Sequence, residues 1–194
     1  MRLKTVRDIE VSVGKLPESY CEWIEKGVTT DDAYTMYLLD WISSSEVLQF
    51  EIAPEGALEG IIPIAVLDGV DLWCLDNKNG GRMILCPHDD IVAALYAPSI
   101  EGWIYRICLG EASDFCDEDV VVQKQLLLWA TLLEKSKPVW AEHIKTLAKS
   151  QATDMGEYYG VISKQEVKGI ITKEFGPEYA RGDKVEFLKP EDDE

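Results

Sequence analysis

The sequence of 194 residues predicts an α+β fold. Residues 61–87 alternate apolar, β-branched runs with turn residues, which is typical of paired strands. Segments before and after this stretch place apolar residues at the three-to-four-residue spacing of helices. Apolar residues make up 46% of the chain, which is enough to form a core.

Two short helices are predicted in the N-terminal part. The first covers residues 5–13 and ends at Gly14, and the second begins at Pro17 and ends at Gly27. The apolar positions that should face the core are Val6, Ile9, Val13, Tyr20, Trp23 and Ile24. We expect the aromatic pair in the second helix to be core packing.

Strands are predicted at residues 34–41, 61–67, 72–75, 83–86 and 91–96. A short helix at residues 43–50 follows the first strand, because a serine cluster offers it a cap. The breaks between the central strands are Asp68-Gly69 and the turn at residues 77–81. Together these residues predict a central hairpin.

Helices dominate the remaining part of the chain. They are predicted from Ile100 to Gly110 and at residues 121–133, 138–149 and 165–175, and a strand is predicted at residues 184–188. The inner positions expected in the helix at 138–149 are Val139, Ile144 and Leu147. The acidic residues 111–119 are predicted to be an exposed connector. We therefore expect an α+β domain at 1–119, a helical extension at 120–190 and a disordered acidic end at 191–194.

Negative charge is concentrated in the middle of the chain. The formal net charge is −17, and residues 27–123 alone contain eighteen acidic and three basic residues. Such a surface repels nucleic acids and anionic membranes and attracts a basic partner. Charge that only keeps a protein in solution is the alternative. The concentration in one segment favours a partner, with neither nucleic acid nor membrane as that partner.

The composition predicts a cytoplasmic protein. No apolar run has the length of a membrane span, and residues 1–14 lack the apolar core and the cleavage site of a signal peptide. The five cysteines are odd in number and form no C-x-x-C pair. This pattern predicts reduced, mostly buried thiols.

No motif predicts a metal site or a cofactor. His88-Asp89-Asp90 contains ligand-type residues, but neighbours on an extended chain point to opposite sides, and His143 is the only other histidine. Residues 76–80 share some features with a calcium loop, but Lys78 occupies a ligand position, so a hairpin turn explains them better.

No motif predicts catalysis either. Cys86 and His88 are close in sequence, but Pro87 between them restricts their geometry. We therefore expect a protein that is not an enzyme. An enzyme would require His88 or His143 to meet a cysteine or two carboxylates in a deep pocket.

Acidic residues in turns and at the ends of elements form the candidate site for a partner. Loops at one edge of a sheet can combine their charges into one field. The candidate partner-binding residues are Asp31, Asp32, Asp68, Asp71, Asp89, Asp90, Asp114 and Asp117. We expect the turn at residues 68–71 and the loop at residues 88–90 to form its main edge.

Several short motifs occur in a characteristic order. They are Leu16-Pro17-Glu18-Ser19-Tyr20, Pro63-Ile64-Ala65, Asp68-Gly69-Val70-Asp71, Cys74-Leu75-Asp76, His88-Asp89-Asp90 and Ala97-Pro98-Ser99-Ile100 leading to Trp103 and Ile104. Over residues 5–110 this order resembles the SUKH superfamily, which includes bacterial immunity proteins of polymorphic toxin systems and fungal cell-wall regulators. Two positions depart from the family pattern: Gly27 stands alone instead of in an Asn-Gly-Gly-like end, and Val70 replaces a small turn residue.

The resemblance implies a twisted, mostly antiparallel sheet with helices packed against it, and a non-catalytic role. Bacterial members of the family bind and neutralise a cognate toxin, often a nuclease. The resulting hypothesis is an immunity-type protein whose acidic surface binds a basic toxin domain. The alternative is a regulatory or scaffold protein of the same fold that binds a cellular partner without inhibiting it.

Overall fold

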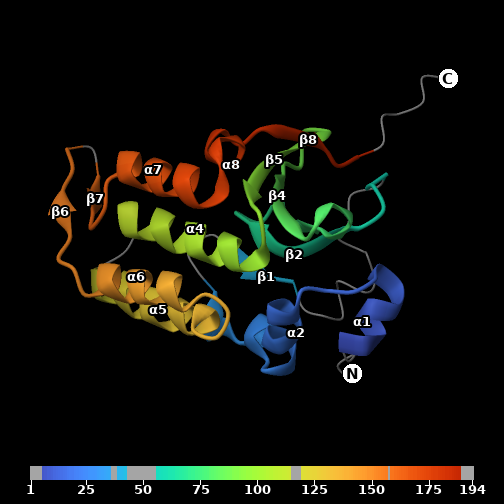
Figure 1. Cartoon of the computed structure of the whole chain (residues 1–194), viewed down its shortest axis with the longest axis horizontal. Coiled ribbons are helices and arrows are strands. Elements are labelled where there is room, and N and C mark those ends of the chain that lie inside the picture. The colour runs from blue at the N-terminus through green and yellow to red at the C-terminus, as the bar shows by residue number, and fades with distance from the viewer. Residues whose placement is uncertain (1–5, 36–38, 43–55, 115–118, 157, 189–194) are drawn as a thin grey trace. The chain divides into compact units, whose positions relative to one another are not determined.

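The computed structural model describes residues 6–35, 39–42, 56–114, 119–156 and 158–188 (Figure 1). The chain divides into two compact units. The first, called the sheet unit below, comprises Met1–Ile100 and Gly182–Glu194, and the second, called the helical unit, comprises Glu101–Arg181. These boundaries differ from the division predicted at 119/120 in two places: the first boundary follows Ile100, and Gly182–Glu194 returns to the sheet unit.

The sheet unit contains an antiparallel sheet with the strand order β1-β2-β3-β4-β5-β8. Its strands are β1 (Leu39–Trp41), β2 (Ile61–Leu67), β3 (Asp71–Asp76), β4 (Arg82–Cys86), β5 (Val92–Ala97) and β8 (Lys184–Glu186). Figure 1 shows β8 beside β5, at the opposite edge from β1. The antiparallel sheet and its accompanying helices confirm the predicted α+β class.

Burial explains the apolar patterns of the central strands. Residues 61–65 of β2 and residues 72–76 of β3 are buried, so both strands are covered on both faces and appear in the sequence as continuous apolar runs. In β5 buried residues alternate with partly exposed ones, as expected for a strand with one covered face. The register between β2 and β3 shifts at Pro63, which has no N–H to donate to a neighbouring strand.

The predicted central hairpin is confirmed. The β2–β3 turn contains Asp68 at φ 53° and Gly69 at φ 73°, and consecutive positive φ values suit a tight turn between twisted strands. The β3–β4 connection is a short 3-10 helix (Asn77–Asn79) followed by Gly80 and Gly81, both at positive φ. The segment at residues 76–80 is thus the hairpin turn that the sequence predicted.

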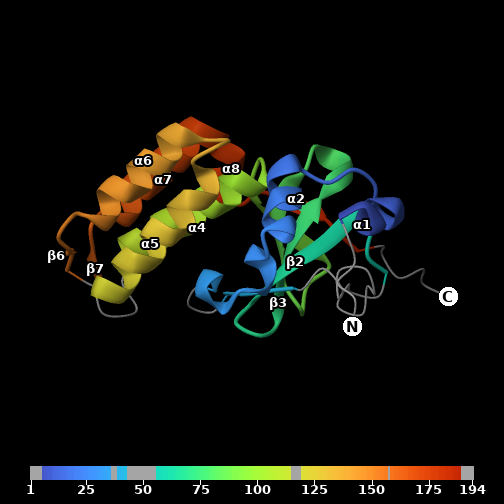
Figure 2. The same ribbon diagram turned by 90° about the horizontal axis from the view of Figure 1, so that it is seen from below.

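Helices α1 (Val6–Val13) and α2 (Glu18–Glu25) confirm the two N-terminal predictions. Gly14 and Gly27 follow them in left-handed conformations. Tyr20 and Trp23 of α2 are buried, and the Trp23 ring meets the Trp41 ring of β1 edge-on at 6.3 Å. Figure 2 shows α2 beside the sheet. The aromatic pair is core packing, as predicted.

The strand predicted at residues 34–41 begins later than expected. Among its described residues, Leu39–Trp41 form a strand, while Tyr34 belongs to a 3-10 turn, Asp32–Tyr34, that the Asp31 side chain caps by accepting from the N–H of Ala33. A local side-chain cap of this kind competes with strand pairing. Residues 36–38, the helix predicted at 43–50 and the end at 191–194 lie outside the described residues.

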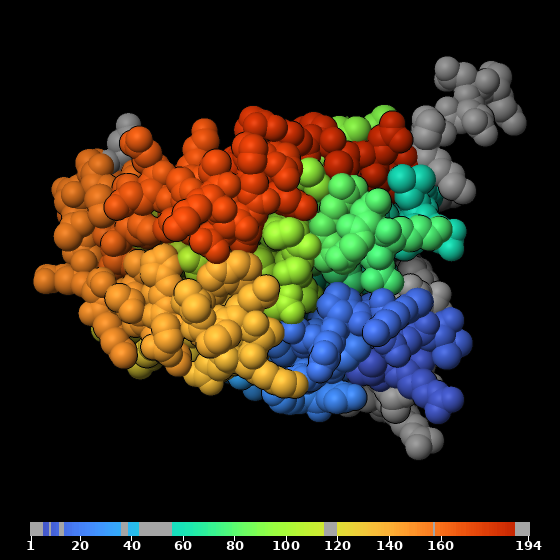
Figure 3. Space-filling model, viewed as in Figure 1, coloured from blue at the N-terminus to red at the C-terminus, as the bar shows by residue number. Residues whose placement is uncertain are grey.

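The helical unit is built from packed helices and a small two-stranded sheet. Its elements are α4 (Ile100–Ser113), α5 (Asp119–Leu133), α6 (Pro138–Ala148), α7 (Lys164–Phe175), α8 (Pro177–Arg181), β6 (Thr153–Asp154) and β7 (Tyr159–Gly160). Trp103 of α4 and Trp129 of α5 are fully buried, with ring centroids 6.3 Å apart. Figure 3 shows α6 and α7 side by side on one face, where Trp140 packs edge-on against Phe175 at 5.6 Å.

Three predictions in this unit are wrong. Helix α4 continues past Gly110 to Ser113, because the N–H of Val161 bonds to the carbonyl of Ala112 and covers its end. Residues 111–113 are therefore helical, with Ala112 and Ser113 buried, instead of an exposed connector. Val139 is 78% exposed, because it precedes the buried Ile144 by five residues, which is about 140° around a helix.

Candidate partner-binding site

Two acidic turns lie at the same end of the antiparallel sheet. Leu67 pairs with Asp71, and Leu72 pairs with Cys86, so the β2–β3 turn and the loop that leaves β4 are neighbours. The first turn contains Asp68, and the second contains Asp89 and Asp90. The strand register therefore brings together the two segments that the sequence predicted as the main functional edge.

A direct contact joins the two turns. The backbone N–H of His88 donates to Asp71 Oδ1 at 3.0 Å, and Nδ1 of the His88 ring lies 2.9 Å from the same oxygen. This hydrogen bond raises the pKa of His88, and it lowers the pKa of Asp71. Asp71 thus holds the second turn in place and is less free to meet a partner than its neighbours.

The other acids of the two turns are more open. Asp68 and Asp89 are exposed, and among the described residues neither carboxylate accepts a hydrogen bond. Asp90 Oδ1 accepts from the N–H of Val92 at 3.2 Å, and its other oxygen lies 3.9 Å from Nζ of Lys184. Both side chains of this ion pair are exposed to solvent, so the pair contributes little to the stability of the fold.

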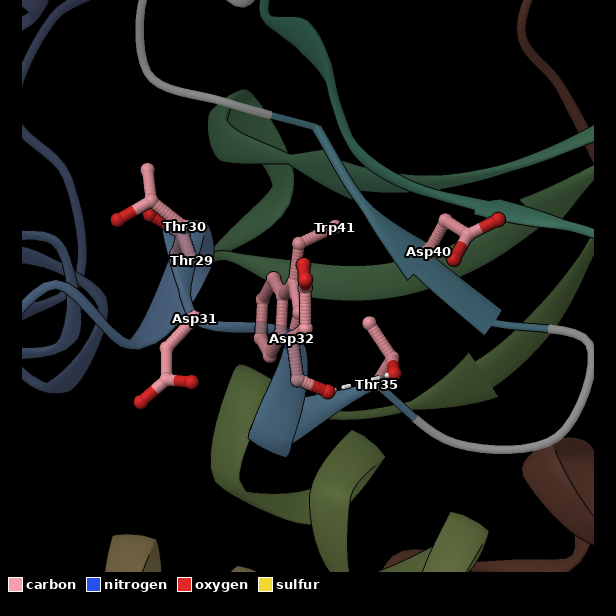
Figure 4. A pocket seen from close by; sticks show the side chains of 7 residues that line it. All are labelled: Thr29, Thr30, Asp31, Asp32, Thr35, Asp40 and Trp41. Carbon is pink, nitrogen blue, oxygen red and sulfur yellow. Dashed lines mark hydrogen bonds between the residues drawn. The ribbon is translucent and has the colours of Figure 1, made fainter.

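A pocket of about 300 Å³ lies along the edge strand β1 (Figure 4). Its acidic lining consists of Asp31, Asp32 and Asp40, and the rest is formed by Thr29, Thr30, Thr35 and Trp41. Asp40 lies opposite Val66, two residues before Asp68, so the pocket is next to the β2–β3 turn. The predicted residues Asp31 and Asp32 therefore belong to the same end of the sheet as the two turns.

Trp41 is held in place at this pocket. Its Nε1–H donates to the carbonyl of Tyr34 at 2.9 Å, and the Trp23 ring meets it edge-on. Figure 4 shows Asp40 on β1 and Thr30 and Asp31 on the preceding turn to either side of Trp41 in that view. Sequence reasoning missed Asp40 and Trp41 as site residues. The signal was the alternation of Leu39, Asp40 and Trp41, which marks Asp40 as the outward-facing residue of a strand.

The last two candidate acids are placed differently. Asp114 belongs to the helical unit and accepts from Nζ of Lys164 at 2.6 Å, with both side chains about half exposed. Asp117 lies outside the described residues. Asp114 is therefore partly neutralised within its own unit, unlike the open acids at the end of the sheet.

Asp76 has a structural role at the other end of the sheet. It is 3% exposed, and its oxygens accept from the backbone and side chain of Asn79 and from Nε of Arg82 at 2.9 Å. A carboxylate saturated with donors in this way stabilises the β3–β4 turn and has little left to offer a ligand. This role in the turn accounts for the pattern of residues 76–80, which shares some features with a calcium loop.

The two histidines have different partners. His88 bonds to Asp71, while the thiol of Cys86 is buried in β4. Nδ1 of His143 lies 2.6 Å from the hydroxyl of Tyr105, which stacks on Trp140 at 4.8 Å, and burial lowers the pKa of His143. Within the described ranges, no group of three His, Cys, Asp or Glu side chains is arranged to hold a metal ion.

Four of the five cysteines lie in the part of the chain that the structure describes, and Cys116 lies outside it. Cys74, Cys86 and Cys108 are buried and free, and Cys21 is half-buried and free. Hydrogen bonding to Cys86 and burial raise the pKa of Cys74, and burial raises the pKa of Cys108. A raised pKa keeps a thiol protonated and unreactive, so these cysteines act as core residues.

Among the helices that the structure describes, none has both the length and the apolar composition needed to cross a bilayer. Comparisons with protein-family models, with curated proteins and with solved structures gave no match to this chain. The likeness to the SUKH superfamily therefore stays a prediction from the order of the sequence motifs.

Proposed function

We propose that this chain is an immunity-type binding protein that neutralises a basic toxin domain, a nuclease, in the cytoplasm. The observation that carries the proposal is the concentration of acids at one end of the sheet. Seven aspartates lie there on β1, the turns beside it and the loop after β4: Asp31, Asp32, Asp40, Asp68, Asp71, Asp89 and Asp90.

The charge balance of this end supports a basic partner. The basic groups that contact its acids in the described residues are His88 and Lys184, at Asp71 and Asp90. Other bases of the sheet unit are paired elsewhere: Lys26 with Glu22, Lys78 with Glu59 and Arg82 with Asp76. The excess of negative charge therefore remains available to a partner.

A nuclease is a suitable basic partner for physical reasons. It must hold phosphate, so its active cleft is positively charged, and an acidic protein surface can occupy that cleft. Complementary charge of this kind can raise association rates toward about 10⁸–10⁹ M⁻¹s⁻¹ at low salt. The same charge repels nucleic acid and anionic membranes, which the proposal excludes as partners.

The test is co-expression of this chain with a basic nuclease toxin encoded beside it in its host. We expect restored growth, inhibition of the purified nuclease, and a complex whose affinity falls steeply between low and moderate salt. A complex without inhibition would support the regulatory or scaffold alternative instead. Affinity that does not change with salt would contradict binding by charge.

The acidic loop after β4 should act mainly on association. Replacing both acids, Asp89→Asn with Asp90→Asn, should slow association several-fold while dissociation changes less, because exposed charges steer the encounter. The control carries the same charge change in the helical unit, Asp154→Asn with Glu174→Gln. Equal association rates for the two double variants would place the loop outside the interface.

A further inference from the structure

Two exposed apolar side chains lie in the acidic turns at the end of the sheet. Val70, in the β2–β3 turn, is 50% exposed, and Ile91, in the loop between β4 and β5, is 58% exposed. We propose that these two side chains are apolar contacts of the interface and receive an apolar side chain carried on a basic segment of the partner. This inference rests on the proposed function, because it names the chemistry that the acidic end of the sheet binds.

The strand register places the two apolar residues close together. The pairing of β3 with β4 puts Val70 level with His88, and the pairing of β4 with β5 puts Ile91 level with His88. Neighbouring strands lie about 4.8 Å apart, so two strand spacings put the backbones of Val70 and Ile91 about 10 Å from each other. One short segment of a partner can contact both.

A hydrogen-bonded pair holds the two turns side by side. Asp71 accepts from the backbone N–H of His88 at 3.0 Å, and the His88 ring lies 2.9 Å from the same oxygen. Asp71 follows Val70 directly, and His88 precedes Ile91 by three residues. Turns that are held in place before binding lose less conformational freedom when a partner arrives. The apolar pair is therefore presented on a preorganised surface.

Their position distinguishes these residues from scattered surface residues. Single exposed apolar side chains are normal on a protein. In the described part of the sheet unit, large apolar side chains are exposed at Val11, Val70 and Ile91. Val11 belongs to helix α1, whereas the other two lie in the two turns that the hydrogen-bonded pair joins. Turns favour glycine, asparagine, aspartate and serine, so turn chemistry does not explain an apolar residue in each of them.

Charge decides which partner fits the apolar pair. Asp68 lies in the same turn as Val70, and Asp89 lies in the same loop as Ile91, and both acids are exposed. A second copy of the chain would bring like charges together, and an anionic membrane would be repelled in the same way. A segment with basic residues around an apolar side chain matches both the acids and the apolar pair.

The two kinds of side chain should act on different steps of binding. Exposed charges attract the partner over a distance, so they act mainly on the association rate. Apolar contacts form once water has left the interface, so their loss acts mainly on the dissociation rate. Val70→Ser with Ile91→Ser should therefore speed dissociation of the toxin complex about tenfold, while Asp89→Asn with Asp90→Asn slows association.

The test uses the full chain with ¹³C-labelled valine and isoleucine methyl groups and two synthetic peptides at constant ionic strength. The first peptide has two leucines between two pairs of lysines, and the second has serines in place of the leucines, so their charge is equal. The methyl resonances of Val70 and Ile91 should shift saturably with the leucine peptide, with a Kd on the order of millimolar. The serine peptide should bind at least fivefold more weakly. Equal affinities, or no shift at these two residues, would overturn the inference.

Variants locate the contact on the surface. Val70→Ser with Ile91→Ser should weaken the leucine peptide about tenfold and change the affinity for the serine peptide less than twofold. The control is Val11→Ser, because it removes an exposed apolar side chain elsewhere in the same unit. It should change the affinity for the leucine peptide less than twofold. Equal losses in the control would show unspecific apolar binding and overturn a contact at the two turns. The comparison of the two peptides tests the inference without any variant.

The outcomes separate this inference from the proposed function. If the leucine peptide binds at the two turns but basic nucleases do not bind the chain, the apolar contact stands and the immunity role fails. If the chain inhibits a nuclease and Val70→Ser with Ile91→Ser leaves the dissociation rate of that complex unchanged, the immunity role stands and the apolar contact fails.

Discussion

The two ends of the antiparallel sheet hold their carboxylates in opposite ways. At one end Asp76 is buried and accepts from both Asn79 and Arg82. At the other end Asp68 and Asp89 are exposed, and within the described ranges no hydrogen bond reaches either carboxylate. The comparison shows that burial and the number of donors distinguish a structural acid from one available to a partner.

The largest change in stability is expected at the end of the sheet where Asp76 is buried. Asp76→Ala should lower the free energy of unfolding by about 3 kcal/mol, because it removes a charged acceptor and leaves Arg82 and Asn79 without their partner. Urea denaturation followed by circular dichroism measures this. Asp89→Ala, at the open end, should leave the unfolding curve essentially unchanged. Similar losses for both variants would remove the distinction between the two ends.

A smaller change in stability is expected in the β2–β3 turn, at the opposite end of the sheet, where the carboxylates are exposed. Asp68 has a φ of 53°, a left-handed conformation that costs an L-residue energy and glycine almost none. Asp68→Gly should therefore raise the free energy of unfolding by about 0.5–1 kcal/mol. Asp68→Asn is the control, because asparagine also tolerates this conformation and removes the same charge. A destabilised glycine variant would show that Asp68 stabilises the fold, in the same way as Asp76.

The smallest effect is expected in the contact between Asp71 and His88. The pKa of His88 is raised, so its contribution to stability is present below its ordinary pKa of 6.5 and is lost as the pH rises through the folded value. The pKa of Asp71 is lowered, so its contribution is present above 3.8 and is lost as the pH falls through the folded value. The contact should therefore be strongest between these two ordinary values.

An NMR titration of the imidazole protons measures this effect. The pKa of His88 should lie above 6.5 in the unmodified protein and return toward 6.5 in Asp71→Asn. His143, whose pKa burial lowers, is an internal control that Asp71→Asn should not change. An unchanged pKa of His88 in the variant would mean that Asp71 does not hold the loop after β4.

Local pattern was sufficient to predict most elements. The runs at residues 61–67 and 83–86 became β2 and β4, and Gly14 and Gly27 end α1 and α2 as expected. These segments carry their own periodicity and their own turn residues, so neighbours far along the chain were not needed. Gly110 failed as a helix end because its helix is continued by a contact with Val161, which sequence spacing does not reveal.

The candidate site was likewise predictable only in part. The acids were visible in the sequence, and six of the predicted ones lie at one end of the sheet: Asp31, Asp32, Asp68, Asp71, Asp89 and Asp90. Their different environments were not visible. Asp71 is bound to His88, and Asp114 is bound to Lys164, fifty residues further along the chain.

The sequence by itself determined the α+β class, the acidic middle and the positions of the turns, because these depend on composition and on periodicity within short segments. Only the tertiary structure decided which carboxylates are buried and paired and which remain open. It also placed Asp40 and Trp41 beside Asp31 and Asp32 in one pocket. The physical reason is that strand register and burial set the distance and the dielectric environment between charges, and neither is a property of a local segment.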